Sequence, residues 1–220
     1  MPSIGVRRHT SSNPWTYLAL DQEQREIADR VRAGGPGALL LSEVAPVITL
    51  GRRTSEQDIL LAPELLKTYG IELHRTDRGG LATYHGPGQW VLFVVDQLET
   101  LTGDRRGVRR AVEGLLEVAL DVGREYFPQA EIRRGCEMGV WTPQGKIAAL
   151  GVHIERGILL HGISVNGFRT LTSFVGLRPC GLDAPVGYLL SEQTEFDHLG
   201  QKLVEAALRR FWRGAGRGKL

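Results

Sequence analysis

The sequence has little of several features that mark particular classes of protein. Its 220 residues include two cysteines, too few for a disulfide framework, and they lack the spacing of a metal finger. Lys plus Arg number 27 and Asp plus Glu 25, which leaves a formal charge of +2. That balance does not favour a nucleic-acid partner, although the last residues are basic. Two unpaired thiols are typical of a reducing compartment.

Long apolar runs are also missing. The longest clear run, residues 90–95, is far shorter than the roughly 20 residues that a membrane-spanning helix needs. Residues 1–13 are polar and have no apolar centre like that of a secretory signal. We therefore expect a cytoplasmic protein without a membrane partner.

What is present is the composition of an ordinary globular protein, with 42% hydrophobic and 24% charged residues. No internal repeat or low-complexity linker divides the chain. The sequence predicts one domain over residues 1–220, and the alternative is a small additional C-terminal subdomain from about residue 171.

Helical and strand patterns are mixed along the chain. Apolar periodicity and end signals predict helices over residues 15–31, 63–69, 104–122 and 196–212. Strands are expected over residues 38–41, 47–50, 71–75, 90–95, 138–141, 146–154 and 158–165. Turn residues at 143–145 and 155–157 predict hairpins, which require antiparallel pairing. We expect an α+β fold with a mixed, largely antiparallel sheet packed with helices.

A glycine-rich segment covers residues 78–89. Its four glycines and one proline predict an irregular loop without helix or strand. It matches neither the dinucleotide-binding nor the Walker pattern. The segment carries Arg78, Thr83, Tyr84 and His85, so it is either a ligand-lining loop or a long connection.

Cys180 lies between Pro179 and Gly181, where a sharp turn would expose its sulfur. A thiol with its ordinary pKa is mostly protonated at neutral pH and needs a nearby cation or base to act as a nucleophile. Lys146, beside the turn at residues 143–145, is a candidate. From the residues alone, a structural Cys180 and a solvated Lys146 remain alternatives. We interpret Cys136 as a structural residue at a strand edge.

His85 and His161 each precede a glycine. Either imidazole could transfer a proton, or could serve as a hydrogen-bonding group within the fold. The six histidines are scattered and no pair has metal-ligand spacing, so the sequence predicts no metal site.

Several segments together resemble the lipoyl(octanoyl) transferase family. The family's loop reads Arg-Gly-Gly, two variable residues, Thr, an aromatic residue and His-Gly-Pro-Gly-Gln, and residues 78–89 match it. Residues 49–52, 146–152, 161–166 and 179–182 resemble four further family segments, in the same order.

The resemblance implies the fold of biotin and lipoate protein ligases and a Cys/Lys dyad of Cys180 and Lys146. It also implies that the acyl pocket is lined by three segments. These are Arg78, Gly79, Gly80, Leu81, Ala82, Thr83, Tyr84 and His85; Ala149, Leu150 and Gly151; and Gly162, Ile163 and Ser164.

The implied reaction moves an octanoyl group from acyl carrier protein to a lysine of a lipoyl domain, through a thioester on Cys180. The implied acceptors are lipoyl domains of 2-oxo-acid dehydrogenases and the glycine-cleavage H protein. No cofactor is expected, because conversion of a thioester to an amide is downhill without ATP. We expect a monomer.

The chain departs from the family pattern at three places: Leu81, Thr170 and the pair Gly187-Tyr188. These departures concern the preferred chain length and the acceptor rather than the dyad. Two other functions stay open. An ATP-dependent lipoate or biotin ligase of the same fold would need no cysteine, and a binding module would keep the pocket without the reaction.

Overall fold

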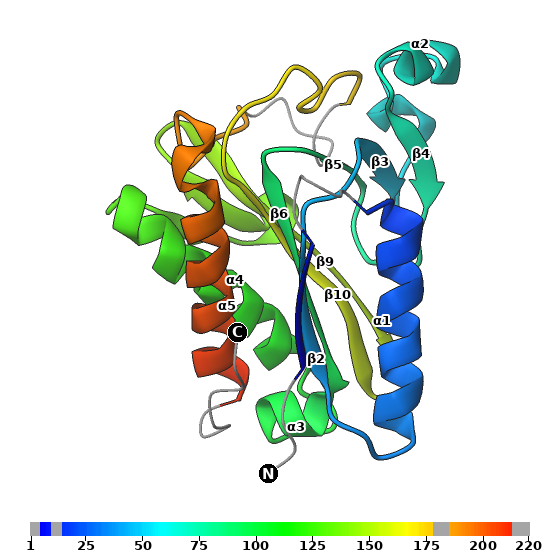
Figure 1. Cartoon of the computed structure of the whole chain (residues 1–220), viewed down its shortest axis with the longest axis vertical. Helices are drawn as coiled ribbons and strands as arrows, with labels where there is room; N and C mark the ends of the chain where they lie inside the picture. The colour runs from blue at the N-terminus through cyan, green and yellow to red at the C-terminus, as the bar shows by residue number, and fades with distance from the viewer. Residues whose placement is uncertain (1–4, 10–14, 178–184, 213–220) are drawn as a thin grey trace.

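A seven-stranded sheet separates two helical layers in the computed structural model, which describes residues 5–9, 15–177 and 185–212 (Figure 1). Helix α1 (Tyr17–Arg32) covers one face. Helices α4 (Val108–Tyr126) and α5 (Phe196–Phe211) cover the other, and the short helix α3 (Leu98–Thr102) precedes α4. In spatial order, the strands are β1 (Gly5–His9), β2 (Ala38–Ser42), β6 (Gln89–Gln97), β10 (Ile158–Asn166), β9 (Gly145–Glu155), β8 (Gly139–Thr142) and β7 (Glu131–Arg133).

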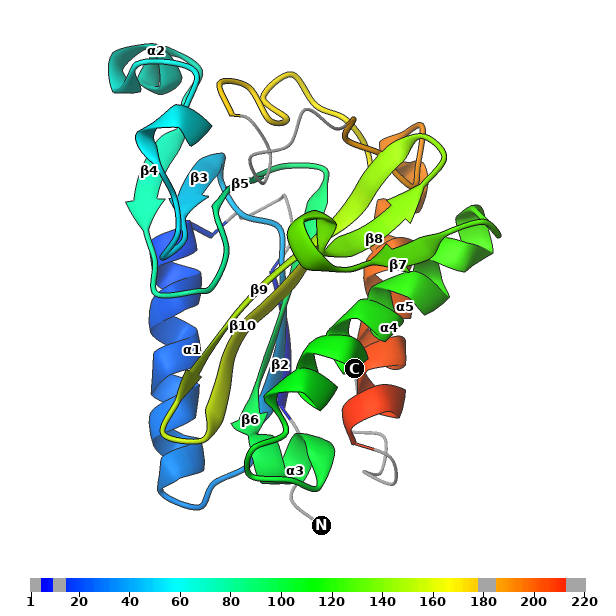
Figure 2. The ribbon, with the colours of Figure 1, turned by 180° about the vertical axis from the view of Figure 1, so that it is seen from behind.

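Strands β1 and β2 are parallel, and the other neighbours in this sheet are antiparallel. Strands β8 and β7 extend the sheet beyond β9 and lie beside α4 (Figure 2). The predicted α+β class with a mixed, largely antiparallel sheet is confirmed.

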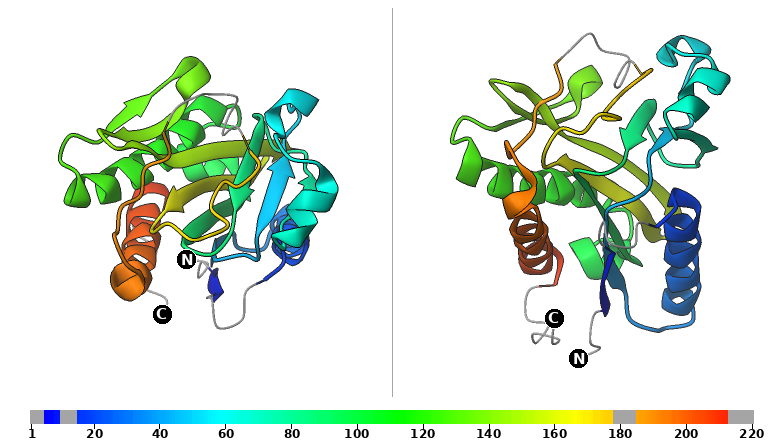
Figure 3. Two further views of the ribbon diagram at one scale, coloured as in Figure 1. Left: turned by 90° about the horizontal axis from the view of Figure 1, so that it is seen from above. Right: turned by 45° about the horizontal axis from the view of Figure 1, so that its top comes forward.

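A second sheet of three strands lies beyond the N-terminal end of α1, next to helix α2 (Pro63–Thr68), as Figures 1 and 3 show. Its order is β4 (Glu72–Arg75), β3 (Val47–Leu50) and β5 (Ala82–His85). Strand β3 pairs parallel with β4 and antiparallel with β5. Short 3-10 turns occur at Glu56–Asp58 (η1), Gly135–Glu137 (η2) and Gln193–Glu195 (η4).

Both predicted hairpins are present. The β9–β10 turn has Arg156 at φ 50° and Gly157 at φ 82°, the pair of positive values that a two-residue type I′ turn requires. The β8–β9 turn is at residues 143 and 144. None of the described helices has the length and apolar character needed to cross a membrane.

The prediction of an irregular loop over residues 78–89 is wrong in its middle. Residues 82–85 form β5, which pairs with β3 and contributes Ala82 to a small apolar core. The glycines flank this strand and none lies within it, so they bend the chain at each end without preventing the pairing.

The helix expected from residue 104 begins at Val108 instead. Gly103 ends α3 with φ 72°, and Gly107 directly precedes α4, so two glycines divide the apolar pattern into two helices. Strands β1 and β7 and helix α3 were not predicted, because each is only three to five residues long.

Strand β10 departs from simple alternation at one residue. Leu160 packs against the α1 layer and Ile163 against the α4–α5 layer, as a strand period of two requires. By the same alternation His161 should face α4 and α5. Its φ is 60°, and its side chain instead contacts Tyr17 and Gln24 of α1. A non-glycine residue in this region costs about 1–3 kcal/mol and commonly marks a functional site.

Candidate functional site

A cavity of about 260 Å³ lies where the glycine-rich segment meets β9 and β10. A dry cavity of about 150 Å³ holds benzene, so this space has room for a longer apolar group. Of the predicted residues, its wall contains Arg78 to Thr83 and His85, then Lys146 and Ala149 to Gly151, and then Gly162 to Ser164. The structure therefore brings three distant segments of the sequence together around one space.

Two predicted residues are not part of this wall as described. The Tyr84 side chain packs on the other side of β5, where its ring contacts Phe174 and its hydroxyl lies 2.8 Å from Thr172 Oγ1. Cys180 lies outside the described residues, in the segment 178–184.

Lys146 is 8% exposed and forms part of the cavity wall. Its Nζ lies 5.7 Å from the centroid of the Trp141 ring, within the range of a cation–π contact. Gly139 leaves room for the lysine stem, because a Cβ at that position would come within 2.4 Å of Lys146 Cε. An amine in an apolar cavity is thus held in place by its neighbours.

The chain that follows the undescribed segment is fixed to the backbone of Lys146. The Lys146 N–H donates to Pro185 O at 2.9 Å, and the Gly187 N–H donates to Lys146 O at 2.9 Å. The side chain of Asn166 donates to the carbonyls of Lys146 and Gly187, at 3.2 and 3.1 Å. Residues 185–187 therefore run alongside the start of β9.

Arg78 is buried and fastens the glycine-rich segment to β3. Its Nη2 donates to Thr49 O and to Thr49 Oγ1, both at 2.7 Å. At Gly51 a Cβ would come within 2.5 Å of Gly80 O, so the close approach of the two segments requires glycine there. These contacts explain why the segment at residues 49–52 accompanies the loop in the sequence pattern.

Four rings in the cavity wall contact one another and are here called the ring cluster: Tyr17, His85, Phe93 and His161. Tyr17 stacks on His85 with centroids 5.5 Å apart, and Phe93 meets His161 edge-on at 5.3 Å. Burial lowers the pKa of His85 to about 3, and its Nδ1 lies 2.7 Å from Gln89 Oε1. The ring is therefore neutral near pH 7.

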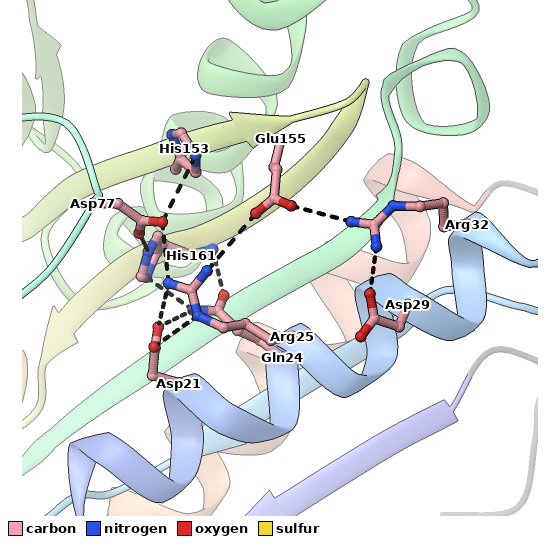
Figure 4. A network of polar contacts seen from close by, with 9 residues as sticks. All are labelled: Asp21, Gln24, Arg25, Asp29, Arg32, Asp77, His153, Glu155 and His161. Atoms are coloured by element: carbon pink, nitrogen blue, oxygen red, sulfur yellow. Dashed lines mark hydrogen bonds and ion pairs between the residues drawn. The ribbon is translucent and has the colours of Figure 1, made fainter.

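His161 is fully buried, and both its ring nitrogens and its backbone N–H have partners (Figure 4). Its N–H donates to Gln24 Oε1 at 2.7 Å, and its Nε2 lies 2.8 Å from Asp77 Oδ1. A carboxylate only accepts, so Nε2 carries the proton and Nδ1 accepts from Tyr17 or Gln24, at 3.3 and 3.2 Å. Burial lowers the pKa of His161, which favours this neutral form.

Asp77 joins this histidine to Arg25 of α1. Its Oδ2 accepts from Arg25 Nη2 at 3.0 Å. The hydrogen bond from His161, and then that from Arg25, hold the pKa of Asp77 well below its usual range. The carboxylate is therefore ionised whenever the fold is intact near neutral pH.

Tyr17 and Phe93 were not predicted as wall residues, because both follow ordinary apolar patterns and no sequence signal identifies them. His161 was considered only as a proton-transfer or hydrogen-bonding group, and it reaches the wall through its positive φ. The expected position of Cys136 at a strand edge was wrong, because it is exposed, lies in η2 and borders the cavity. Within the described ranges, no cluster of His, Cys, Asp or Glu could hold a metal ion.

The arrangement combines a narrow apolar space with a buried amine at its wall. A family model for the lipoyl protein ligase A/B catalytic domain matches residues 13–211. The chain belongs to this family. The predicted resemblance is confirmed.

Curated relatives of the chain within the family carry the name octanoyltransferase. The protein of Magnetococcus marinus is 36% identical over 201 residues, which cover 90% of each chain. The protein of Mycobacterium marinum is 40% identical over 80% of this chain and 75% of its own length.

Solved structures of lipoate protein ligases share the fold. A lipoate-protein ligase A bound with ATP aligns over 96% of this chain and 85% of its own, with a TM-score of 0.71 and 15% identity. A bipartite lipoate protein ligase from Thermoplasma acidophilum aligns over 96% and 84%, with a TM-score of 0.67 and 15% identity. The ligase-like fold expected from the sequence is confirmed.

Proposed function

We propose that this chain is an octanoyltransferase that forms an acyl-enzyme on Cys180 and passes the octanoyl group to a lysine of a lipoyl domain. The chain is an acyltransferase that acts in protein lipoylation, as its curated relatives indicate. The donor, the thioester intermediate and the roles of individual residues form the proposal.

The observation that carries the proposal is Lys146 in the wall of an apolar cavity. The space suits an alkyl chain, and each methylene buried there would contribute about 0.8 kcal/mol. Around its wall, small residues such as Ala149, Gly151 and Gly162 leave the backbone accessible to a ligand.

The position of Cys180 in the chain supports its role as nucleophile. Pro185, whose carbonyl accepts from the Lys146 N–H, is five positions after Cys180. Five residues span at most about 18 Å, so the length of the chain allows the thiol to reach Lys146. An ammonium near a thiol favours the thiolate, which is the reactive form.

In the first step the Cys180 thiolate attacks the carbonyl carbon of the donor thioester. The bond between that carbon and the carrier sulfur breaks, and the carrier leaves as a thiol with a proton from the Lys146 ammonium. The products are an octanoyl thioester on Cys180 and a neutral Lys146 amine.

In the second step the amine of the acceptor lysine attacks this thioester. An amide bond forms, the bond to the Cys180 sulfur breaks, and the amine's surplus proton returns to Lys146. The thiolate and the ammonium are regenerated, so the cycle balances without ATP.

The partners proposed for this reaction are octanoyl-acyl carrier protein as donor and lipoyl domains as acceptors. Lipoyl-domain acceptors accord with the family as a whole. Acceptor domains from 2-oxo-acid dehydrogenases and the glycine-cleavage H protein, action as a monomer in the cytoplasm, and a single domain remain parts of the proposal.

A transfer assay tests it. The purified chain, octanoyl-acyl carrier protein and a lipoyl domain are incubated without ATP, and the lipoyl domain is weighed by mass spectrometry. Wild type should add one octanoyl group, and Cys180→Ser should add none. Transfer that depends on ATP with free octanoate, or that survives Cys180→Ser, would contradict the proposal in favour of a ligase. A chain that binds the lipoyl domain without modifying it would be a binding module.

A further inference from the structure

We propose that Asp77 is a positioning residue that holds the glycine-rich segment against β10 and α1, so that the ring cluster closes the far end of the acyl cavity. The inference rests on the proposed function for the identity of the ligand. The attachment of the glycine-rich segment to β10 and α1 is argued from contacts within the chain.

Asp77 bridges three parts of the fold (Figure 4). It directly precedes Arg78, the first wall residue of the glycine-rich segment. Its two carboxylate oxygens accept from His161 of β10 and from Arg25 of α1, at 2.8 and 3.0 Å. His153 Nε2 of β9 lies 3.7 Å from the same carboxylate. One side chain therefore ties the segment to both walls beside it.

The segment has further attachments next to Asp77. Arg78 bonds Thr49 of β3, and the Gly79 N–H donates to Val152 O of β9 at 2.9 Å. These two attach the segment to elements other than β10 and α1. Loss of the Asp77 carboxylate would leave the segment joined to β3 and β9 but released from the ring cluster.

The ring cluster depends on the bond between Asp77 and His161. His161 holds a positive φ within a strand, which strains the backbone, and the bond to Asp77 fixes its ring on the α1 side. The same bond fixes the proton on Nε2, so that Nδ1 can accept from Tyr17. Tyr17 in turn stacks on His85, which continues the cluster across the cavity.

The ring cluster lies far from Lys146 along the sheet. His161 pairs with Val152, six residues after Lys146 on β9, which is about 20 Å at the rise of a strand. An acyl chain attached near Lys146 would point its methyl end toward the cluster. Both ring nitrogens of His161 have partners, so the cluster presents ring faces to that end of the chain.

Selectivity for chain length measures whether this end is closed. In a closed apolar pocket each methylene favours binding about fourfold, so octanoyl should exceed hexanoyl by about fifteenfold in kcat/KM. For Asp77→Ala we expect the ratio to fall below about fivefold. A variant that is merely less stable loses active enzyme for both donors equally, so the ratio separates positioning from folding.

A second measurement does not depend on activity. Amide hydrogen exchange of the peptide that contains His161, whose backbone N–H donates to Gln24 Oε1, should be at least tenfold faster in Asp77→Ala than in wild type. Asp77→Asn keeps an oxygen acceptor for His161 and loses the charge toward Arg25. Its octanoyl-to-hexanoyl ratio and its exchange rate should therefore lie between those of wild type and Asp77→Ala. Asp29→Ala is the matched control, because this α1 carboxylate pairs with Arg32 at the outer end of the network. The substitution should leave the octanoyl-to-hexanoyl ratio and the exchange rate unchanged.

The outcomes are distinguishable. If the wild-type protein transferred neither acyl group, the proposed function would be contradicted. The exchange measurement would still test whether Asp77 attaches the glycine-rich segment to β10 and α1. An Asp77→Ala protein with wild-type selectivity and wild-type exchange at His161 would overturn the inference. So would an equal loss of selectivity in Asp29→Ala.

Discussion

At the scale of single residues, Lys146 carries the most weight in the proposed reaction. Its backbone is bonded on one side to residues 185–187, and its side chain lies between Gly139 and the Trp141 ring. A lysine held this way can give and take a proton at one place. Arginine at the same position would keep the charge but would not release its proton.

Substitution of Lys146 tests that distinction. Lys146→Ala should lower kcat/KM for transfer at least a hundredfold, since positioned proton transfer contributes about 10²–10⁴. Lys146→Arg should stay within tenfold of the alanine variant, because it restores charge alone. Steady-state kinetics at neutral pH give kcat/KM for wild type and both variants, and circular dichroism verifies that the variants are folded. Near wild-type activity in Lys146→Arg would show that charge alone suffices.

His85 shows how burial, together with a nearby cation, sets the charge state of a side chain. Its folded pKa of about 3 lies below the ordinary value, with burial as the largest cause and the charge of Arg78 second. The unfolded chain therefore binds a proton near pH 6.5 that the folded chain refuses down to about pH 3. Stability must fall as pH is lowered through this window.

The pH dependence of unfolding measures this effect. Between pH 7 and pH 5 the contribution of His85 should lower the free energy of unfolding by about 2 kcal/mol. His85→Asn should remove that part of the slope, whatever its stability at pH 7. Urea titrations of both proteins at the two pH values give the free energies of unfolding. If the free energy of unfolding changed with pH equally in both proteins, His85 would bind a proton in the folded state as it does in the unfolded chain.

At the scale of elements, the regular parts of the fold were predictable and the irregular parts were not. Residues 47–50 and 158–165 have strand patterns strong enough to predict β3 and β10, and the turn at residues 155–157 marks the hairpin that joins β9 to β10. Strand β5 was missed because glycines surround it, and its pairing with β3 is a tertiary effect. Alternation along β10 would place His161 on the α4–α5 face, and its positive φ turns the ring to the α1 face instead.

The β9–β10 turn offers a prediction for this scale. Arg156 is exposed and adopts φ 50°, a conformation that asparagine tolerates better than arginine. Arg156→Asn should raise the free energy of unfolding by about 0.5–1 kcal/mol in a urea titration. Arg156→Ala has a Cβ and no local hydrogen-bonding group, so it should not stabilise. Equal effects of both variants would refute the explanation through turn conformation.

At the scale of the whole molecule, the fold assembles its cavity from segments that are far apart in the sequence. Strand β5, strands β9 and β10 and the first turn of α1 meet there, and Val112 of α4 also borders the cavity. The family pattern could predict the segments containing Lys146 and Gly162, since their spacing is characteristic. It could not predict Tyr17 or Asp77, because their role depends on how α1 and the glycine-rich segment pack.

The chemistry proposed for the whole molecule leaves one chemical trace, an octanoyl group on one of two cysteines. The intact mass of the protein after incubation with octanoyl-acyl carrier protein, without an acceptor, tests this most directly. We predict a gain of one octanoyl group that hydroxylamine removes, that persists in Cys136→Ser and that is lost in Cys180→Ser. An adduct that follows Cys136, or the absence of any adduct in a protein that still transfers octanoate, would contradict the account.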